Sequence, residues 1–383
     1  MFKYLKPKHF IAAAAMFALT SCSQDDVIDM GVQDTNKPRE IEFTIDMLSR
    51  ATDRTIDNLD TIWVFADNGT TQVFDFTPFI KDEYGRFVPE TKQYWPDGAE
   101  SVNFTAVYPN PSKLNITKTP GKLTFTHNIG ITYANRFYDL VTAFKAVAKQ
   151  EYNGSIPLEF RHAFAQIEFK AKIGPESDFK VDAYAVSIAY YNHYATLDLT
   201  TNTWKNNNSI LNTSGSYTAP KEVFTVGEEA KSLTDLWGNF YIPAQTRSFP
   251  QYNVTPVTNT GMDFKFYGIV KDKETDALLY GTDLWADDSA VKKVRTPNPD
   301  NMSQLQEVRN LDKCGISYIS LSTEPIEFKA GTKYVFTLDF TNGIGYLSSS
   351  DPLNPYGPAV PNKMSANVTV EDWTTTDFSS NAN

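Results

Sequence analysis

The sequence predicts an all-β protein built as two antiparallel β-sandwiches in tandem. Aromatic residues make up 14% of the chain, and β-branched and aromatic residues recur in short runs separated by Gly, Pro, Asn and Asp. Few stretches show a helical period, and no repeat of 20–50 residues is visible, which excludes a solenoid or a propeller. A length of 383 residues is long for one domain and comfortable for two.

The first expected strand spans residues 41–47. Its apolar residues Ile41, Phe43, Ile45 and Met47 alternate with polar ones, which is the period of a half-buried strand. The next expected strand, 59–66, carries apolar residues on both faces and is therefore placed in the centre of a sheet. Further strands of this first domain are expected at 72–80, 84–88, 102–108 and 123–129.

Residues 139–149 are ambiguous, because Leu140, Phe144 and Val147 fit a helical stripe while 140–144 also fits a strand. A polar break at 151–155 marks the expected boundary between domains 51–154 and 155–383. Alternation predicts strands of the second domain at 157–172, 182–191, 195–199, 240–242, 264–270, 277–280, 333–340 and 366–370. The polar stretch 285–311 is predicted to be an insertion or long loop.

The chain begins with a secretory signal, in which a basic head is followed by an apolar run over residues 10–19. This run is too short to span a membrane, which takes about 20 apolar residues. Leu19-Thr20-Ser21-Cys22 resembles a bacterial lipobox. We therefore predict a lipoprotein signal peptide over residues 1–21 and lipid attachment at Cys22. An ordinary signal peptide with an incidental cysteine is the alternative.

Charge and cysteine content argue against two kinds of site. Losing residues 1–21 removes three lysines and no acid, which takes the net charge from −11 to −14. Nucleic-acid binding needs clustered Lys and Arg, so no nucleic-acid partner is expected. The other cysteine, Cys314, has no partner once Cys22 carries lipid, which excludes a disulfide framework and a cysteine zinc site.

No catalytic motif is found. His127, His162 and His193 lie on separate expected strands without carboxylate or cysteine spacing. The chain has no nucleophile elbow, phosphate-binding loop or His-Glu-x-x-His pattern. A glycosidase carboxylate pair depends on a separation of about 5–10 Å across a cleft, which leaves no pattern in a sequence. We predict that the protein is not an enzyme and has no catalytic residues, metal or other cofactor.

Six tryptophans are candidates for stacking on sugars. Each lies in or beside an expected strand, where packing within or at the edge of a sheet is the more common role. They are Trp63, Trp95, Trp204, Trp237, Trp285 and Trp373.

A series of short motifs follows in order along nearly the whole chain. They are Tyr94-Trp95-Pro96, 102–109, Asp139-Leu140-Val141, 157–169, Leu197-Asp198-Leu199 with Trp204, 240–245, 331–338 and Val370-Glu371-Asp372-Trp373. Behind a lipobox, this order resembles the fimbrillin family of Bacteroidota. Members of that family are lipoprotein precursors of major and minor fimbrial subunits and related Mfa-like proteins.

The resemblance implies two transthyretin-like (Greek-key) antiparallel β-sandwiches. It also implies export as a lipoprotein to the outer membrane with exposure on the cell surface, followed by a place in the fimbrium after maturation. The acidic Ser23-Gln24-Asp25-Asp26 after Cys22 resembles the tether of surface-exported lipoproteins, and a plain flexible tether is the alternative. The implied partners are other pilus subunits, in a homo- or heteropolymer, and host or bacterial surface ligands.

In the family, an arginine-specific protease removes the N-terminal strand, and the groove then accepts a strand from the next subunit. Here the strand 41–47 precedes Arg50 by three residues, so cutting after Arg50 would remove residues 22–50 with the lipid. Arg54 is the alternative, and Arg39 is poorer because it would spare the strand. The donor is expected at Asn367, Val368, Thr369 and Val370.

Two other interpretations of the function remain open. Arg50 is a plain loop residue if the strand stays in place, as in a fimbrial anchor or tip subunit that keeps its N-terminal strand. A surface-anchored glycan-binding lipoprotein would share the anchor and the sandwiches. It would need a row of exposed Trp or Tyr side chains on one face.

Overall fold

The structure is a computed structural model of the chain and describes the following residues: 39–45, 59–119, 121–128, 139–189, 191–210, 215–218, 224–233, 240–248, 262–281, 291–295, 305–309, 315–319, 325–343, 346–347 and 365–372. Every regular element in these ranges is a β-strand, except one short 3-10 helix, η1 (Pro111–Lys113). The predicted all-β fold class is therefore confirmed. None of these ranges contains a helix long and apolar enough to cross a membrane.

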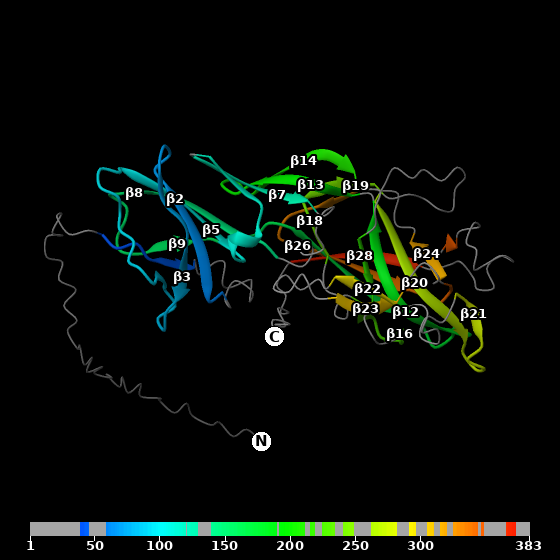
Figure 1. Cartoon of the computed structure of the whole chain (residues 1–383). Coiled ribbons are helices and arrows are strands. Elements are labelled where there is room, and N and C mark those ends of the chain that lie inside the picture. Colours follow the sequence, from blue (N-terminus) through cyan, green and yellow to red (C-terminus); the bar gives the residue numbers. More distant parts are fainter. Residues whose placement is uncertain are drawn as a thin grey trace, which may run out of the picture. The chain divides into compact units, whose positions relative to one another are not determined.

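The first sheet has eight strands, including β2, β3, β5, β8 and β9 of Figure 1. Their order is β10 (Arg161–His162), β8 (Val141–Ala148), β5 (Ser101–Tyr108), β2 (Thr61–Asp67), β3 (Gln72–Lys81), β4 (Phe87–Pro89), β1 (Phe43–Ile45) and β9 (Ile156–Leu158). Neighbours are antiparallel, except β1 and β9, which run parallel. Phe43 lies opposite both Phe87 of β4 and Ile156 of β9, so β1 has a neighbour on each side.

The eight-stranded sheet curls back on itself around a core of its own. β1 and β5 are four places apart in the order, which is about 19 Å along a flat sheet with strands about 4.8 Å apart. The ring centroids of Phe43 and Phe104 are nevertheless only 5.3 Å apart. The apolar faces of these two strands therefore pack against each other across the inside of the curl.

A four-stranded sheet packs against the other face of β2 and β5. Its order is β14 (Thr203–Ile210), β13 (Asn192–Asp198), β7 (Lys122–Asn128) and β6 (Ile116–Thr119). Phe65 of β2 and Val107 of β5 share a buried cluster with Phe125 of β7 and Leu197 of β13. Strand β2 is thus central and carries buried residues on both faces, as its sequence predicts.

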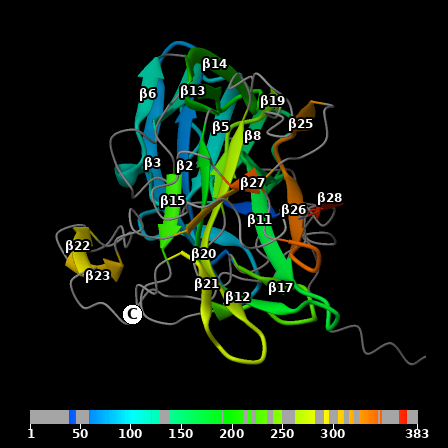
Figure 2. The same cartoon turned by 90° about the vertical axis from the view of Figure 1, so that its right-hand side faces the viewer.

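A five-stranded and a seven-stranded sheet form a sandwich in the second half of the chain. One has the order β17 (Lys231–Ser232), β11 (Ala165–Lys172), β26 (Thr332–Asp339) and β28 (Ser365–Asp372), with β18 (Phe240–Ile242) also paired to β11. The other has the order β15 (Gly215–Thr218), β12 (Phe179–Ala189), β20 (Asp263–Asp272), β24 (Gly315–Ile319) and β27 (Tyr346–Leu347). In it, β16 (Phe224–Thr225) pairs with β12 and β21 (Leu278–Tyr280) pairs with β20. Figure 2 shows β11 beside β26, and β12 close to β20.

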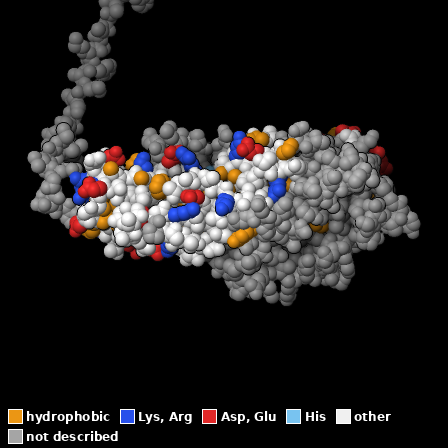
Figure 3. Space-filling view, turned by 90° about the horizontal axis from the view of Figure 1, so that it is seen from above, with side chains coloured by type: hydrophobic (Ala, Val, Ile, Leu, Met, Phe, Trp, Pro, Cys, Tyr) orange, Lys and Arg blue, Asp and Glu red, His pale blue; other side chains and the backbone are white. Residues whose placement is uncertain are grey.

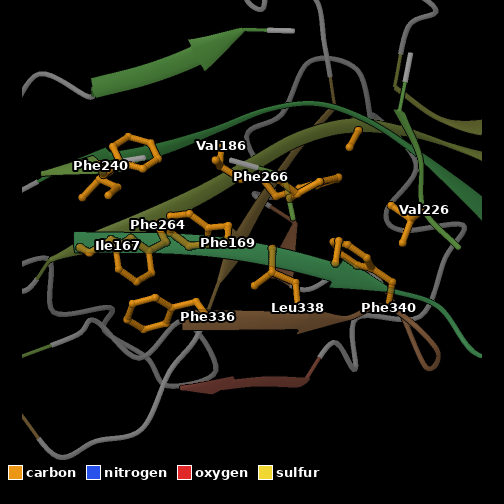
Figure 4. Close-up of a cluster of buried hydrophobic side chains, with 14 of the residues drawn as sticks. Ile167, Phe169, Val186, Val226, Phe240, Phe264, Phe266, Phe336, Leu338 and Phe340 are labelled. Carbon is orange, nitrogen blue, oxygen red and sulfur yellow. The ribbon is translucent and has the colours of Figure 1, made fainter. Parts of the chain in front are cut away.

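The core of this sandwich is aromatic (Figure 4). Phe169 of β11 and Phe336 of β26 stack with 5.6 Å between ring centroids. Phe264 of β20 meets both rings edge-on, at 5.0 and 4.8 Å. The strands β11 and β26 are parallel over seven residue pairs, from Gln166–Lys333 to Lys172–Asp339. The sheets are thus mainly antiparallel, with parallel ladders at β11–β26 and β1–β9.

The remaining described strands form two separate pairs. β19 (Gln245–Arg247) pairs with β25 (Ile326–Phe328). β22 (Val291–Arg295) pairs with β23 (Leu305–Arg309), and both lie inside the expected insertion 285–311. The described part of that insertion is therefore a two-stranded ladder rather than a plain loop.

The expected domain boundary at 154/155 falls between strands that share sheets. β9 and β10 follow it in sequence but belong to the eight-stranded sheet, and β7 precedes it but pairs with β13. The described residues belong to one compact unit that begins at Arg39. The division into two sandwich domains stays a prediction. The ambiguous segment 139–149 contains the strand β8.

Candidate functional site

The described histidines have structural surroundings. Nδ1 of His162 lies 2.6 Å from Oδ2 of Asp139, and both side chains are buried. His127 is buried against the rings of Phe125, Phe164 and Trp204. Within the described residues, no group of three or more His, Cys, Asp or Glu side chains is placed to hold a metal ion.

The described tryptophans take part in packing. Trp95 is buried and stacks on Tyr152 with 5.4 Å between ring centroids. Trp63 and Trp204 are half-buried against the cluster between β2, β5, β7 and β13. Trp237, Trp285 and Trp373 lie outside the described residues. The three described tryptophans therefore give no support to a row of exposed rings for stacking on sugars.

The surface charge of the described part is mixed. In Figure 3, Lys and Arg side chains lie beside Asp and Glu side chains, and neither sign forms a continuous field on this face. The ion pairs of the described residues include Lys118–Asp75 at 2.6 Å and Arg161–Glu159 at 2.6 Å. A polyanion would find little net attraction on such a face.

The N-terminal strand, which was expected to be removed on maturation, has buried apolar side chains. Ile41, Phe43 and Ile45 are 1%, 0% and 3% exposed, as their alternation predicts. Phe43 lies edge-on to the rings of Phe79 and Phe104, with 4.8 and 5.3 Å between centroids. Besides its pairing with β4 and β9, this three-residue strand is thus held by side chains that enter the core of the eight-stranded sheet.

Backbone hydrogen bonds hold residues 39–42 on both edges, and those to residues 93 and 95 lie on the edge that faces β4. The N–H of Ile41 donates to the carbonyl of Gln93 at 2.8 Å, and the N–H of Trp95 donates to the carbonyl of Arg39 at 2.8 Å. On the other side, the N–H of Ile156 donates to the carbonyl of Glu42 at 3.0 Å. Residues 39–45 are therefore bonded along both edges.

Two cations flank this segment from the side of β4. Arg86, directly before β4, lies 3.2 Å from the carboxylate of Glu42 and 2.8 Å from that of Asp82. Lys92, shortly after β4, lies 2.5 Å from the carboxylate of Glu40. The hydrogen bond with Asp82 and the charge of Glu42 raise the pKa of Arg86. The hydrogen bond with Glu40 raises the pKa of Lys92.

Tyr152 contacts the backbone at the start of residues 39–45. Its phenol O–H donates to the carbonyl of Glu40, and its oxygen lies 3.0 Å from the carbonyl of Gly154. Burial raises the pKa of Tyr152 to about 12, so the phenol stays protonated at neutral pH. Nη1 of Arg39 donates to the carbonyl of Lys149 at 2.8 Å and lies 3.4 Å from that of Tyr152. These contacts engage the guanidinium group of Arg39 with two backbone carbonyls.

Replacing Tyr152 by phenylalanine is expected to lower the free energy of unfolding by about 1–2 kcal/mol at pH 7. The ring can still stack on Trp95, but the carbonyl of Glu40 loses its donor. Because the folded-state pKa is raised from 10 to about 12, the phenol's contribution is complete below pH 10 and falls as the pH rises toward 12. Urea unfolding at pH 7 and pH 10.5 measures both effects, and an equal loss at both values would contradict this role of the phenol.

The other predicted site residues are placed as follows. Met47, Arg50, Arg54 and Cys22 lie outside the described residues. Asn367, Val368, Thr369 and Val370 lie in β28, as expected for a C-terminal strand. β28 pairs with β26 over eight residues and is the last strand of its sheet's order. The side chain of Val370 is 62% exposed, so this apolar residue is not covered in the uncut chain.

Sequence reasoning missed the groups that receive the strand. Arg86, Lys92 and Tyr152 carry no motif, and they are 44, 52 and 112 residues from their partners, Glu42 for Arg86 and Glu40 for the other two, which precede β1. The available signal was Glu42 on the polar face of the predicted strand 41–47, with Glu40 directly before that strand.

Comparisons with known proteins agree with this fold. The sequence profile of the fimbrillin-like family matches residues 49–373. A fimbrial protein from Bacteroides vulgatus has 14% identity and a TM-score of 0.51, covering 88% of this chain and 100% of its own. A putative cell adhesion protein from Bacteroides uniformis has 16% identity and a TM-score of 0.46, covering 88% and 98%. Comparison with curated proteins gives no match.

The profile covers most of the chain, and the Bacteroides vulgatus structure supports the fold alone. The class of protein that this profile defines is the fimbrial one. This chain belongs to the fimbrillin-like family.

Proposed function

We propose that this chain is the precursor of a fimbrial subunit that polymerises by strand exchange and supports adhesion. It is exported as a lipoprotein through Cys22, exposed on the outer membrane, and released from its lipid by cleavage after Arg50, with Arg54 as the alternative. Its partners are other pilus subunits, and adhesion is to host or bacterial surfaces. Membership of the fimbrillin-like family supports the assembly role.

The observation that carries this proposal is the position of β1. The strand buries Ile41, Phe43 and Ile45 in the first core, yet it lies N-terminal to Arg50, so one cut separates it from every other strand of its sheet. Its loss would leave β4 and β9 without their shared neighbour and would expose the rings of Phe79 and Phe104. An open apolar groove between two unpaired edges strongly favours an incoming strand.

The C-terminal strand is the proposed donor. Among the described strands β28 pairs with β26 alone, and Thr369 and Val370 are exposed. An edge strand can leave its sheet by breaking a single ladder, whereas a central strand must break two.

A fimbrial anchor or tip subunit that keeps β1 is the second candidate. The hydrogen bonds and ion pairs of residues 39–45 favour it, because they hold the strand along both edges. The two candidates differ in one measurable property, which is the N-terminal residue of the protein in assembled fimbriae.

Replacing Arg50 by alanine is expected to abolish assembly. The precursor is purified with its N-terminus intact and treated with an arginine-specific protease. Wild-type protein is expected to start at Ala51 and to form a ladder of oligomers on gels, whereas R50A keeps β1 and stays monomeric. R54A is the matched control and is expected to behave as wild type.

Two outcomes would contradict the proposal. Assembled fimbriae from cells whose subunits still begin at Cys22 would show that β1 is retained, which favours the anchor or tip candidate. Wild-type protein that starts at Ala51 and never forms a ladder would contradict strand exchange itself.

A further inference from the structure

The groove that β1 occupies is lined by charge as well as by apolar rings. Arg86 and Lys92 stand on the side of β4, and each pairs with an acid of the segment that lies in the groove. Without that segment, Arg86 would keep Asp82, while Lys92 would lose the carboxylate that it contacts at 2.5 Å. The groove therefore carries a positive edge that its occupant must match.

The present occupant matches it through a simple pattern. Acids stand at Glu40 and Glu42, directly before the buried Ile41 and Phe43, and Thr44 precedes the buried Ile45. Acids and buried apolar residues thus alternate over the first four positions. A strand of this pattern satisfies the cations on its outer face and the core on its inner face.

This chain's own β28 lacks that pattern in the direction in which β1 runs. Aligning Ala366, Val368 and Val370 with the three buried positions places Ser365 and Asn367 where the acids stand. If Met364, Ala366 and Val368 take the three buried positions instead, Lys363 takes the position of Glu40, next to Lys92. If Val368, Val370 and Asp372 take them, the carboxylate of Asp372 stands at the buried position of Ile45.

The size of the central residue points the same way. Phe43 fills the space between Phe79 and Phe104, where both ring contacts are edge-on. Valine at that position would remove most of these contacts and leave a cavity that the surrounding strands close only in part. Alanine at the position of Ile41 would add a second cavity.

We propose that the strand entering this groove comes from a different subunit, not from a second copy of this chain. This inference rests on the proposed loss of β1 and on β28 as the proposed donor. The partner segment carries acidic side chains at the places of Glu40 and Glu42 and a large apolar or aromatic side chain at the place of Phe43. The groove thus selects for an ordered heteropolymer over a self-polymer.

A peptide displacement experiment tests this selection. The precursor is cut after Arg50, and the fragment that contains β1 is displaced with labelled peptides of equal length. One peptide has the sequence of residues 39–47 and one that of 364–372. The 39–47 peptide is expected to bind more than tenfold tighter. In its sequence, E40Q and E42Q together are expected to weaken binding two- to twentyfold, with the difference shrinking at high salt.

Two further variants isolate the charge effect. Placing acids in the 364–372 peptide through S365E and N367E is expected to strengthen its binding. In the protein, R86E is expected to reverse the preference, so that a 39–47 peptide with E42K binds better than the unchanged peptide. K118Q is the matched surface control, because Lys118 pairs with Asp75 rather than with Glu40 or Glu42.

The outcomes separate this inference from the proposed function. Equal binding of the 364–372 and 39–47 peptides would overturn the selection for a foreign strand and leave strand exchange intact. Failure of even the 39–47 peptide to enter would overturn strand exchange, and this inference with it. If the E40Q and E42Q changes leave the affinity of the 39–47 peptide unchanged at low salt, Arg86 and Lys92 do not select for acidic side chains, and that part of the inference is overturned.

Discussion

Replacing Phe43 by alanine is expected to lower the free energy of unfolding of the uncut protein by about 3–5 kcal/mol. The side chain is fully buried and contacts the rings of Phe79 and Phe104. Its removal leaves a cavity in a core whose strands are fixed by their ladders, so collapse around the gap is limited. Urea unfolding of the precursor measures the loss.

The same substitution separates the precursor from the assembled form. If β1 is removed on maturation, assembled subunits no longer contain residue 43, and fimbriae made from F43A precursor are expected to match wild type in stability. The control is F336A, which enlarges a space between Phe169 and Phe264 in the second sandwich. F336A is expected to weaken precursor and fimbria alike. Fimbriae that are weakened equally by F43A and F336A would show that β1 remains in the mature protein.

Alternation in the sequence predicted the buried strands well. Ile41, Phe43 and Ile45 of the predicted strand 41–47 are buried, and so are the alternating Tyr334, Phe336 and Leu338 of β26. Strand β2, with apolar residues on both faces, was correctly placed in the centre of a sheet, since Ile62 and Val64 enter one core and Phe65 enters another. The expected single strand 157–172 was wrong in extent, because the structure divides it into β9, β10 and β11, and β11 belongs to a different sheet.

A period of two in the sequence does not predict β-bulges. In β3, Phe74 pairs with Ala66 and Thr77 with Val64, so two residues oppose one and the ladder contains a bulge. Phe76 within the bulge has φ of +37° and packs against Phe65, on the opposite face from Phe74. A simple alternation would have placed Phe74 and Phe76 on the same face. The expected strand 84–88, placed around a turn at Gly85, begins only at Phe87, and Gly85 itself lies in a turn.

The apolar residues of the candidate site could be predicted from the sequence, whereas their polar partners could not. Its apolar residues Ile41, Phe43 and Ile45 are neighbours in sequence, so their pattern is visible. Its polar partners Arg86 and Tyr152 come from distant segments, and only the order of strands in the sheet brings them to β1. Parallel ladders such as β1–β9 have no hairpin signal either, because the paired strands are not joined by a short turn.

Breaking the buried ion pair between Glu168 and Lys333 is expected to destabilise the protein by about 3–5 kcal/mol. The two side chains are 6% and 10% exposed, and Nζ of Lys333 lies 2.5 Å from Oε2 of Glu168. They link the parallel strands β11 and β26, which are separated by well over a hundred residues of chain. Replacing Glu168 by leucine leaves the ammonium group of Lys333 buried without this carboxylate, and the desolvation of that charge is no longer offset.

The double variant distinguishes the charge effect from a packing effect. Changing Glu168 to leucine and Lys333 to methionine removes both charges and keeps the side-chain volumes similar, so its stability is expected to lie near that of wild type. Arg161 and Glu159 provide the exposed control, since their pair at 2.6 Å has both side chains more than half exposed. R161A is expected to cost less than about 1 kcal/mol. A double variant as unstable as the sum of the single ones would show that packing, rather than the uncompensated charge, sets the loss.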